Sequence, residues 1–187
     1  MKNRRLLTLG LGVVVLVALA ATGCFVTSAQ VLVHYALPNP FSIDNADDFE
    51  VIPVDLSTIS AYQDHKDKLK DISDFALIGT FTNVSGPGGG VEIFISAAGP
   101  IYGSADEIRA HATKLWGPGT IGATGSVRTI GWDDSAALFG ATGKAMLLNE
   151  AKGDGKFTLY AVGTPESASN QIRVDKGFLI LVIGAGV

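Results

Sequence analysis

Apolar residues alternate with polar or small ones in short blocks separated by Gly- and Pro-rich runs. This pattern restricts the fold more than any other feature of the chain. Phe75, Leu77 and Phe81 all occupy odd-numbered positions of the block 75–82, so they would lie on the same face of a strand. The block 91–95, which follows "SGPGGG", alternates in the same way. A period of two is typical of half-buried strands, whereas helices repeat every 3.6 residues. We therefore expect these two blocks to form a β-hairpin with the Gly/Pro run as its turn.

Further blocks of this kind predict about seven short strands in all. Pro53 cannot donate a backbone hydrogen bond, so its strand is expected at an edge or a bend. Residues 178–183 are apolar on both faces, as in a central strand covered on each side. The additional expected strands are 31–35, 49–54, 125–132, 156–163, 170–175 and 177–186.

Three helical segments are expected in the connections between these strands. Residues 57–73 carry an apolar stripe and a capping box, Ser60 with Gln63. Residues 104–119 carry a second capping box and are expected to stop at Gly117-Pro118, and a third segment within 133–153 is expected to end at Gly153. Together these patterns predict an antiparallel β-sandwich, of Greek-key or immunoglobulin-like type, with two or three inserted helices. The alternative is an α+β domain with one antiparallel sheet and helices on a single face.

The N-terminus has the organisation of an export signal. Lys2, Arg4 and Arg5 precede the apolar run Leu6–Ala20, which is followed by small residues. The apolar run is slightly shorter than the roughly 17 residues that a membrane-spanning helix needs. A basic head, an apolar centre and small residues are typical of a cleaved secretory signal, so we expect residues 1–23 to be a signal peptide.

The residues that close this segment, Ala21-Thr22-Gly23-Cys24, resemble the lipobox of bacterial lipoproteins, with Ala21 where that family usually has Leu. The resemblance implies that the Cys24 thiol is alkylated by a diacylglycerol, that a peptidase cuts before it, and that the new amino group is acylated. Phe25 stands where an Asp tends to retain such proteins in the inner membrane, which implies passage to the outer membrane. A lone cysteine forms no internal disulfide, and lipidation accounts for its presence in an exported chain.

Removing residues 1–23 removes three basic and no acidic residues, which leaves 11 basic and 18 acidic residues and a net charge of −7. Without a basic patch, nucleic acid is not an expected partner.

The length of about 160 residues after the signal peptide suits one domain. We expect residues 24–45 to be the lipidated Cys24, a tether and an extended arm, and residues 46–187 to be a single sandwich domain. The run 55–99 is similar to lipoprotein β-sandwich domains, a resemblance that implies no particular chemistry.

No catalytic constellation, cofactor motif or metal-ligand spacing is recognised. The histidines form no closely spaced pair, and "SGPGGG" lacks the Lys-Ser/Thr ending of a phosphate loop. The only candidates for ligand binding are Trp116, Trp132, Asp133 and Asp134, which combine aromatic rings with paired carboxylates.

Three hypotheses for function follow. The first is a membrane-anchored binding or structural module, not an enzyme, that contacts another envelope or extracellular protein. The second is a carbohydrate-binding or glycan-processing domain that uses the four candidate residues. The third is a subunit of a surface assembly in which the apolar final strand pairs with a neighbouring copy.

Overall fold

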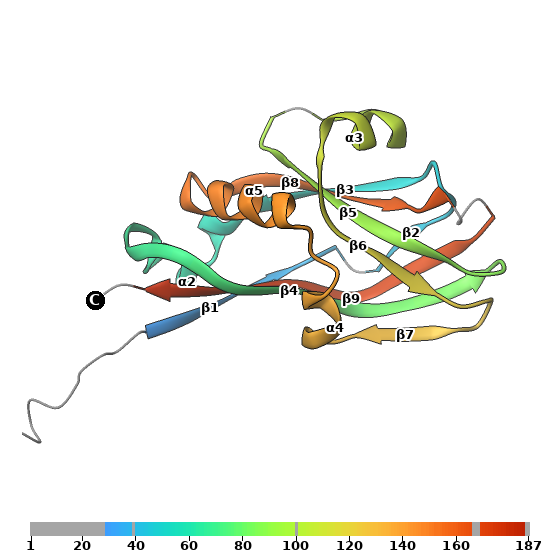
Figure 1. Ribbon diagram of the computed structural model, residues 1–187, viewed down its shortest axis with the longest axis horizontal. Coiled ribbons are helices and arrows are strands. Elements are labelled where there is room, and N and C mark those ends of the chain that lie inside the picture. Colours follow the sequence, from blue (N-terminus) through green and yellow to red (C-terminus); the bar gives the residue numbers. More distant parts are fainter. Residues whose placement is uncertain (1–28, 39, 100, 166–168, 186–187) are drawn as a thin grey trace, which may run out of the picture.

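The computed structural model describes residues 29–38, 40–99, 101–165 and 169–185, which form two antiparallel sheets stacked face to face (Figure 1). The mainly β sandwich predicted from the sequence is therefore confirmed, and the one-sheet alternative is wrong. The first sheet, sheet A, has the order β1 (Ala29–Ala36), β9 (Gln171–Ala185), β4 (Leu69–Ser85) and β7 (Val127–Ile130), with β2 (Phe41–Ile43) also paired to β9. The second, sheet B, has the order β3 (Phe49–Asp55), β8 (Lys156–Gly163), β5 (Gly89–Ala97) and β6 (Thr113–Ile121).

The main core lies between the inner faces of the two sheets. Val33 and Leu179 of sheet A and Ile93 and Leu159 of sheet B are at most 2% exposed and belong to one apolar cluster. Alternation along each strand sends every second side chain into this layer. The strand predicted to be central is central, because β9 is paired on one edge with β1 and on the other with β4.

The domain begins earlier than the sequence suggested. The expected tether and arm, residues 24–45, includes β1 and β2, and both strands pair with β9 in sheet A. The boundary expected at residue 46 is therefore wrong, and the sandwich includes the chain from Ala29. The reason is that Val33 and Ile43 are almost fully buried core residues, which an arm outside the domain would leave in water.

The predicted hairpin over residues 75–95 is also wrong. Both blocks are strands, but β4 pairs with β7 and β9 in sheet A, while β5 pairs with β6 and β8 in sheet B. The short turn between them carries the chain from one sheet to the other. The Asn83 amide supports this turn by donating to the carbonyls of Gly86 and Gly122, and Gly86 adopts a positive φ of 102°. Alternation marks a strand, but the strand's partner is decided elsewhere in the chain.

The helix predicted over residues 57–73 is largely replaced by other structure. The chain forms a short 3-10 turn, η1 (Leu56–Thr58), then α2 (Ser60–Gln63) and a second 3-10 turn, η2 (Lys66–Lys68), and β4 begins at Leu69. The expected capping box is absent, because Ile59 occupies the N-cap and no side chain caps α2. The long strand β9 offers pairing partners as far as Ala185, and residues 69–74 pair with it instead of continuing a helix.

The second predicted helix is correct at its start and wrong at its end. In α3 (Ala105–His111) the Ser104 hydroxyl caps the helix by accepting a hydrogen bond from the Glu107 backbone N–H, and the Glu107 carboxylate accepts from the Gly103 backbone N–H. The helix ends at His111, and the residues up to Gly117-Pro118 belong to β6. Helix α3 covers part of the outer face of sheet B, where Ile108 packs with Phe94 and Tyr160 in a second apolar cluster (Figure 1).

Two further helices, α4 (Trp132–Ala136) and α5 (Ala141–Lys152), join β7 to β8. The prediction of a helical segment ending at Gly153 is confirmed, because Gly153 is the C-cap of α5. Four α-helices therefore occur in the described residues, where two or three were expected. Within that part of the chain, none is long and apolar enough to cross a membrane.

Candidate functional site

Trp116, one of the four predicted ligand-binding residues, lies in the core. Its side chain is 0% exposed, stacks on Phe81, and donates its ring N–H to the Ser135 hydroxyl at 3.1 Å. It cannot serve as a stacking platform for a sugar, and this expectation is wrong. The prediction assumed that Trp116 lay at the end of a helix, whereas strand β6 turns its ring between the sheets.

The other three candidates form the first turn of α4. Trp132 is half-buried and donates its ring N–H to the Asp74 carboxylate at 3.1 Å. Asp133 and Asp134 are exposed, where carboxylates stabilise a helix by facing its positive N-terminal dipole. The structure keeps these three residues together because they are adjacent in sequence, but it separates them from Trp116, and their contacts are those of a helix start.

The acidic stretch between β2 and β3 is a hydrogen-bonded turn. The Asp48 carboxylate accepts from the Asp44 backbone N–H at 2.7 Å, and the Asn45 side-chain oxygen accepts from the Asp47 N–H at 2.8 Å. Among the described residues, His, Cys, Asp and Glu side chains form no group of three that could hold a metal ion. This stretch therefore shapes the chain's entry into β3.

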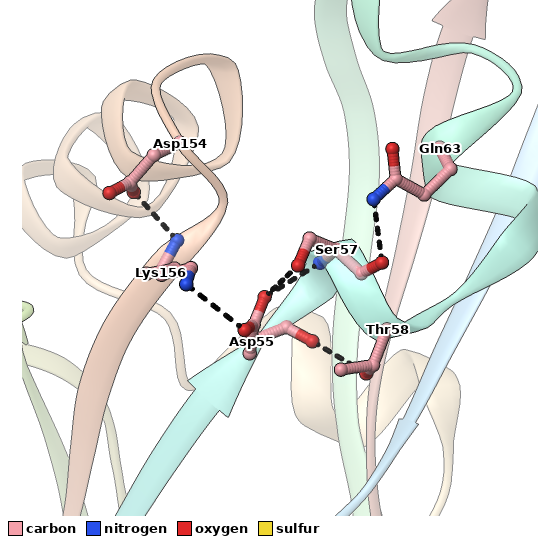
Figure 2. A network of polar contacts seen from close by, with 6 residues as sticks. All are labelled: Asp55, Ser57, Thr58, Gln63, Asp154 and Lys156. Carbon is pink, nitrogen blue, oxygen red and sulfur yellow. Dashed lines mark hydrogen bonds and ion pairs between the residues drawn. The ribbon is translucent and has the colours of Figure 1, made fainter.

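A polar cluster that the sequence did not indicate lies where β3 ends beside the start of β8 (Figure 2). The Asp55 carboxylate caps η1 by accepting from the backbone N–H and the hydroxyl of Ser57. Lys156, its partner in the strand register, places its ammonium 3.3 Å from the other Asp55 oxygen. The Ser57 hydroxyl above all, together with the Ser57 N–H and Lys156, lowers the pKa of Asp55 below its ordinary value. Asp55 is therefore held as an anion.

This cluster lies at one end of a groove with a volume of about 410 Å³. The groove runs between β3 and the loop that follows β5, and Ile101 of that loop is 73% exposed. At its other margin the Tyr35 hydroxyl donates to the Pro53 carbonyl at 2.7 Å. Burial, followed by the nearby Asp55 charge, raises the pKa of Tyr35, so this phenol stays neutral. The apolar lining consists of Tyr35, Val51, Pro53, Val54, Ala98, Ile101 and Phe157.

A second depression of about 450 Å³ adjoins the first and shares Ala98 and Lys156 with it. It is more polar, since Asn149, Glu150 and Asp154 from the end of α5 and the following turn line it. Asp154 itself accepts from the Lys156 backbone N–H at 2.9 Å (Figure 2). Lys156 thus lies between an apolar groove and a polar one.

The arrangement is suited to binding. Asp55 and Lys156 neutralise each other, and the Ser57 hydroxyl donates to Asp55 in the contact that caps η1. Sequence reasoning missed the site because Asp55 and Lys156 are brought together only by the pairing of β3 with β8. The one local signal was "VDLST", in which an Asp two residues before a Ser is typical of a side-chain-capped turn.

Comparison with known proteins gives no relative from which a role could be transferred: no family model, no curated protein and no solved structure matches this chain.

Proposed function

We propose that this chain is a lipid-anchored envelope protein whose β-sandwich is a binding module for another protein. The anchor is the diacylglycerol that the lipobox resemblance implies at Cys24, and Phe25 after it favours the outer membrane. This part of the proposal rests on the sequence, because residues 1–28 lie outside the described residues.

The position of β1 adds a consequence for the anchor. Only residues 25–28 separate Cys24 from Ala29, the first residue of β1. Five residue steps reach at most about 18 Å when fully extended. A lipid on Cys24 would hold the sandwich next to the bilayer surface, and its partner would have to lie within that narrow zone.

The groove beside Asp55 is the proposed binding surface, and the exposure of Ile101 is the observation that carries it. An isolated exposed aliphatic side chain needs no explanation, but this one borders a concave surface with further apolar walls. An apolar groove with a charged pair at one end fits an apolar side chain of a protein partner flanked by polar groups. The glycan alternative has less support, because Trp116 is buried and the Trp132 N–H is already bonded.

The anchor is tested by intact mass of the membrane-extracted protein beside a Cys24→Ala variant. We expect a mass that fits cleavage before Cys24 plus acyl chains, and loss of that species in the variant. A soluble wild-type chain without lipid would contradict the anchor and leave the groove to be tested by itself.

The groove is tested by replacing Ile101 with a photo-crosslinking aromatic residue and irradiating intact membranes. Val127 is the matched control, since it is a large apolar side chain, 64% exposed, on β7 of the opposite sheet. We expect a discrete crosslinked protein from position 101 and none of that mass from position 127. Identical products from both positions would mean random contact and would contradict the groove as the binding surface.

A further inference from the structure

The edges of the two sheets are not equally protected against pairing with another strand. An edge strand presents unpaired N–H and C=O groups, which proteins commonly block with proline, bound side chains or short strands. At the two ends of β3 the Leu56 N–H donates to Gly155 O, and Asp48 O accepts from the Gly163 N–H. The backbone N–H and C=O groups of even-numbered residues therefore point toward β8, and those of odd-numbered residues point away from the sheet. Pro53 therefore brings no donor to this edge, and its carbonyl already accepts from Tyr35.

The edges formed by β6 and β7 are also blocked. Beside β6, the segment Leu138–Gly140 closes the edge, because Leu138 O accepts from the Gly117 N–H and the Gly140 N–H donates to Leu115 O. Strand β7 is only four residues long, and a short edge offers few groups to a partner.

Strand β1 differs from these three edges. The Leu37 N–H donates to Gly177 O, so odd-numbered residues of β1 bond to β9, and the N–H and C=O groups of even-numbered residues point away from the sheet. These outward residues are Gln30, Leu32, His34 and Ala36, and no hydrogen bond of their outward backbone groups occurs within the described residues. The strand "AQVLVHYA" contains no proline and no Lys, Arg, Asp or Glu, and Leu32 is 51% exposed.

We propose that β1 is the site at which a second copy of this chain pairs edge to edge, extending sheet A across a two-fold axis. A symmetric antiparallel pair must join outward-facing residues to outward-facing residues. With the axis at Val33, Leu32 lies opposite His34 of the second copy, and Gln30 lies opposite its Ala36. The four outward residues of one copy then lie opposite the four of the other, and each opposing pair of residues forms two backbone hydrogen bonds. The dimer therefore gains about eight hydrogen bonds, which is within the range of a typical specific interface.

Charge is the reason for assigning this edge to a second copy. The chain is acidic, with a net charge of −4, so net repulsion opposes contact between two copies unless the contact region is free of like charges. Strand β1 is a stretch without formal charge, where two copies can meet with no like-charged pair across the contact. The same pairing would cover Leu32, which is otherwise half exposed. The proposal is independent of the lipid anchor and of the groove.

The test is the mass of the full chain in density-matched detergent micelles, by sedimentation equilibrium over a range of protein concentrations. We expect the wild type to be a reversible dimer and Leu32→Lys to raise its Kd about tenfold, because both copies lose a cross-strand pair and gain charge. Val127→Lys, the same change at the opposite edge of sheet A, is expected to leave the Kd unchanged. His34→Pro removes only an outward donor and is expected to weaken the dimer without a large loss of thermal stability.

A wild type that is monomeric throughout would overturn the proposal. So would a dimer that Leu32→Lys leaves intact, or one that Val127→Lys dissociates to the same degree. A different protein co-purifying at fixed stoichiometry with the wild type but not with Leu32→Lys would assign the edge to a heterologous strand and overturn the second copy. If His34→Pro fails to fold, the Leu32→Lys and Val127→Lys pair decides the question.

Discussion

Replacing Gly143 with alanine should destabilise this protein, although the same change stabilises most helices. Gly143 lies inside α5, where alanine is favoured over glycine by about 1 kcal/mol. The structure opposes that gain, because Gly143 faces β6. A Cβ atom at this position would lie 2.5 Å from Leu115 Cα and 2.5 Å from Lys114 O.

The magnitude follows from what has to move. Carbon atoms pack at about 3.5–4 Å, so the helix would have to withdraw from β6 by about 1 Å. Overpacking of this kind costs about 1–3 kcal/mol, since the obstructing atoms are backbone. Withdrawal would also loosen Leu147 and Ala151, which are both 0% exposed in the core. Backbone atoms cannot move aside, so the cost lies near the upper end of this range, and after the helix-propensity gain of about 1 kcal/mol is subtracted we expect a net loss of about 2 kcal/mol in the free energy of unfolding.

The assay is urea unfolding followed by tryptophan fluorescence, together with the thermal midpoint. For a chain of this size each kcal/mol lowers the midpoint by about 2–4 °C. The control is Thr142→Ala, the neighbouring exposed position of α5, which should change stability by less than about 0.5 kcal/mol. A Gly143→Ala variant as stable as the wild type, or more stable, would refute the close helix–strand contact as the reason for glycine.

Two further predictions concern polar contacts. Ser135→Ala should cost about 2–4 kcal/mol in urea unfolding, because the Ser135 hydroxyl accepts from both the Leu77 N–H and the Trp116 ring N–H, and both donors would be left buried without a partner; a loss below about 0.5 kcal/mol would contradict this. The second concerns Asp55, whose pKa is lowered in the fold. Its contribution to stability should be present above the ordinary pKa of about 4 and lost as the pH falls through the lower folded-state value. The stability difference between wild type and Asp55→Asn should therefore be constant near neutral pH and shrink in acid, and a difference independent of pH down to about 3 would contradict the lowered pKa of Asp55.

The sequence predicted strands better than it predicted partners. Alternation correctly marked the strands around Phe81 and Ile93, because burying one face of a strand leaves a local period of two. It could not show that these strands lie in different sheets, since register and pairing depend on residues far along the chain. The helix predicted over residues 57–73 was wrong for the same reason, because pairing with β9 outweighed a weak helical pattern.

The candidate site was predictable to a smaller extent. Trp116 was selected because tryptophan is a common binding residue, but its burial depends on how β6 packs against sheet A. Asp55 and Lys156 have no common sequence signal, and only the β3–β8 register brings them together. The local motif at Asp55 predicts a turn capped by a side chain, but it does not predict the groove that this turn borders.

The sequence by itself determined the features that depend on neighbouring residues: the resemblance to a lipobox at Cys24, the N-cap of α3 at Ser104, the helix end at Gly153, and the identity of most strands. Each is governed by contacts within a few residues, so the local order of side chains suffices. The tertiary structure alone decided that the sandwich includes β1, that Trp116 is core, and that β1 is an edge strand of sheet A without a formal charge. These depend on which strands pair across long stretches of chain, and burial of a shared apolar core selects that pairing from the many that the local pattern permits.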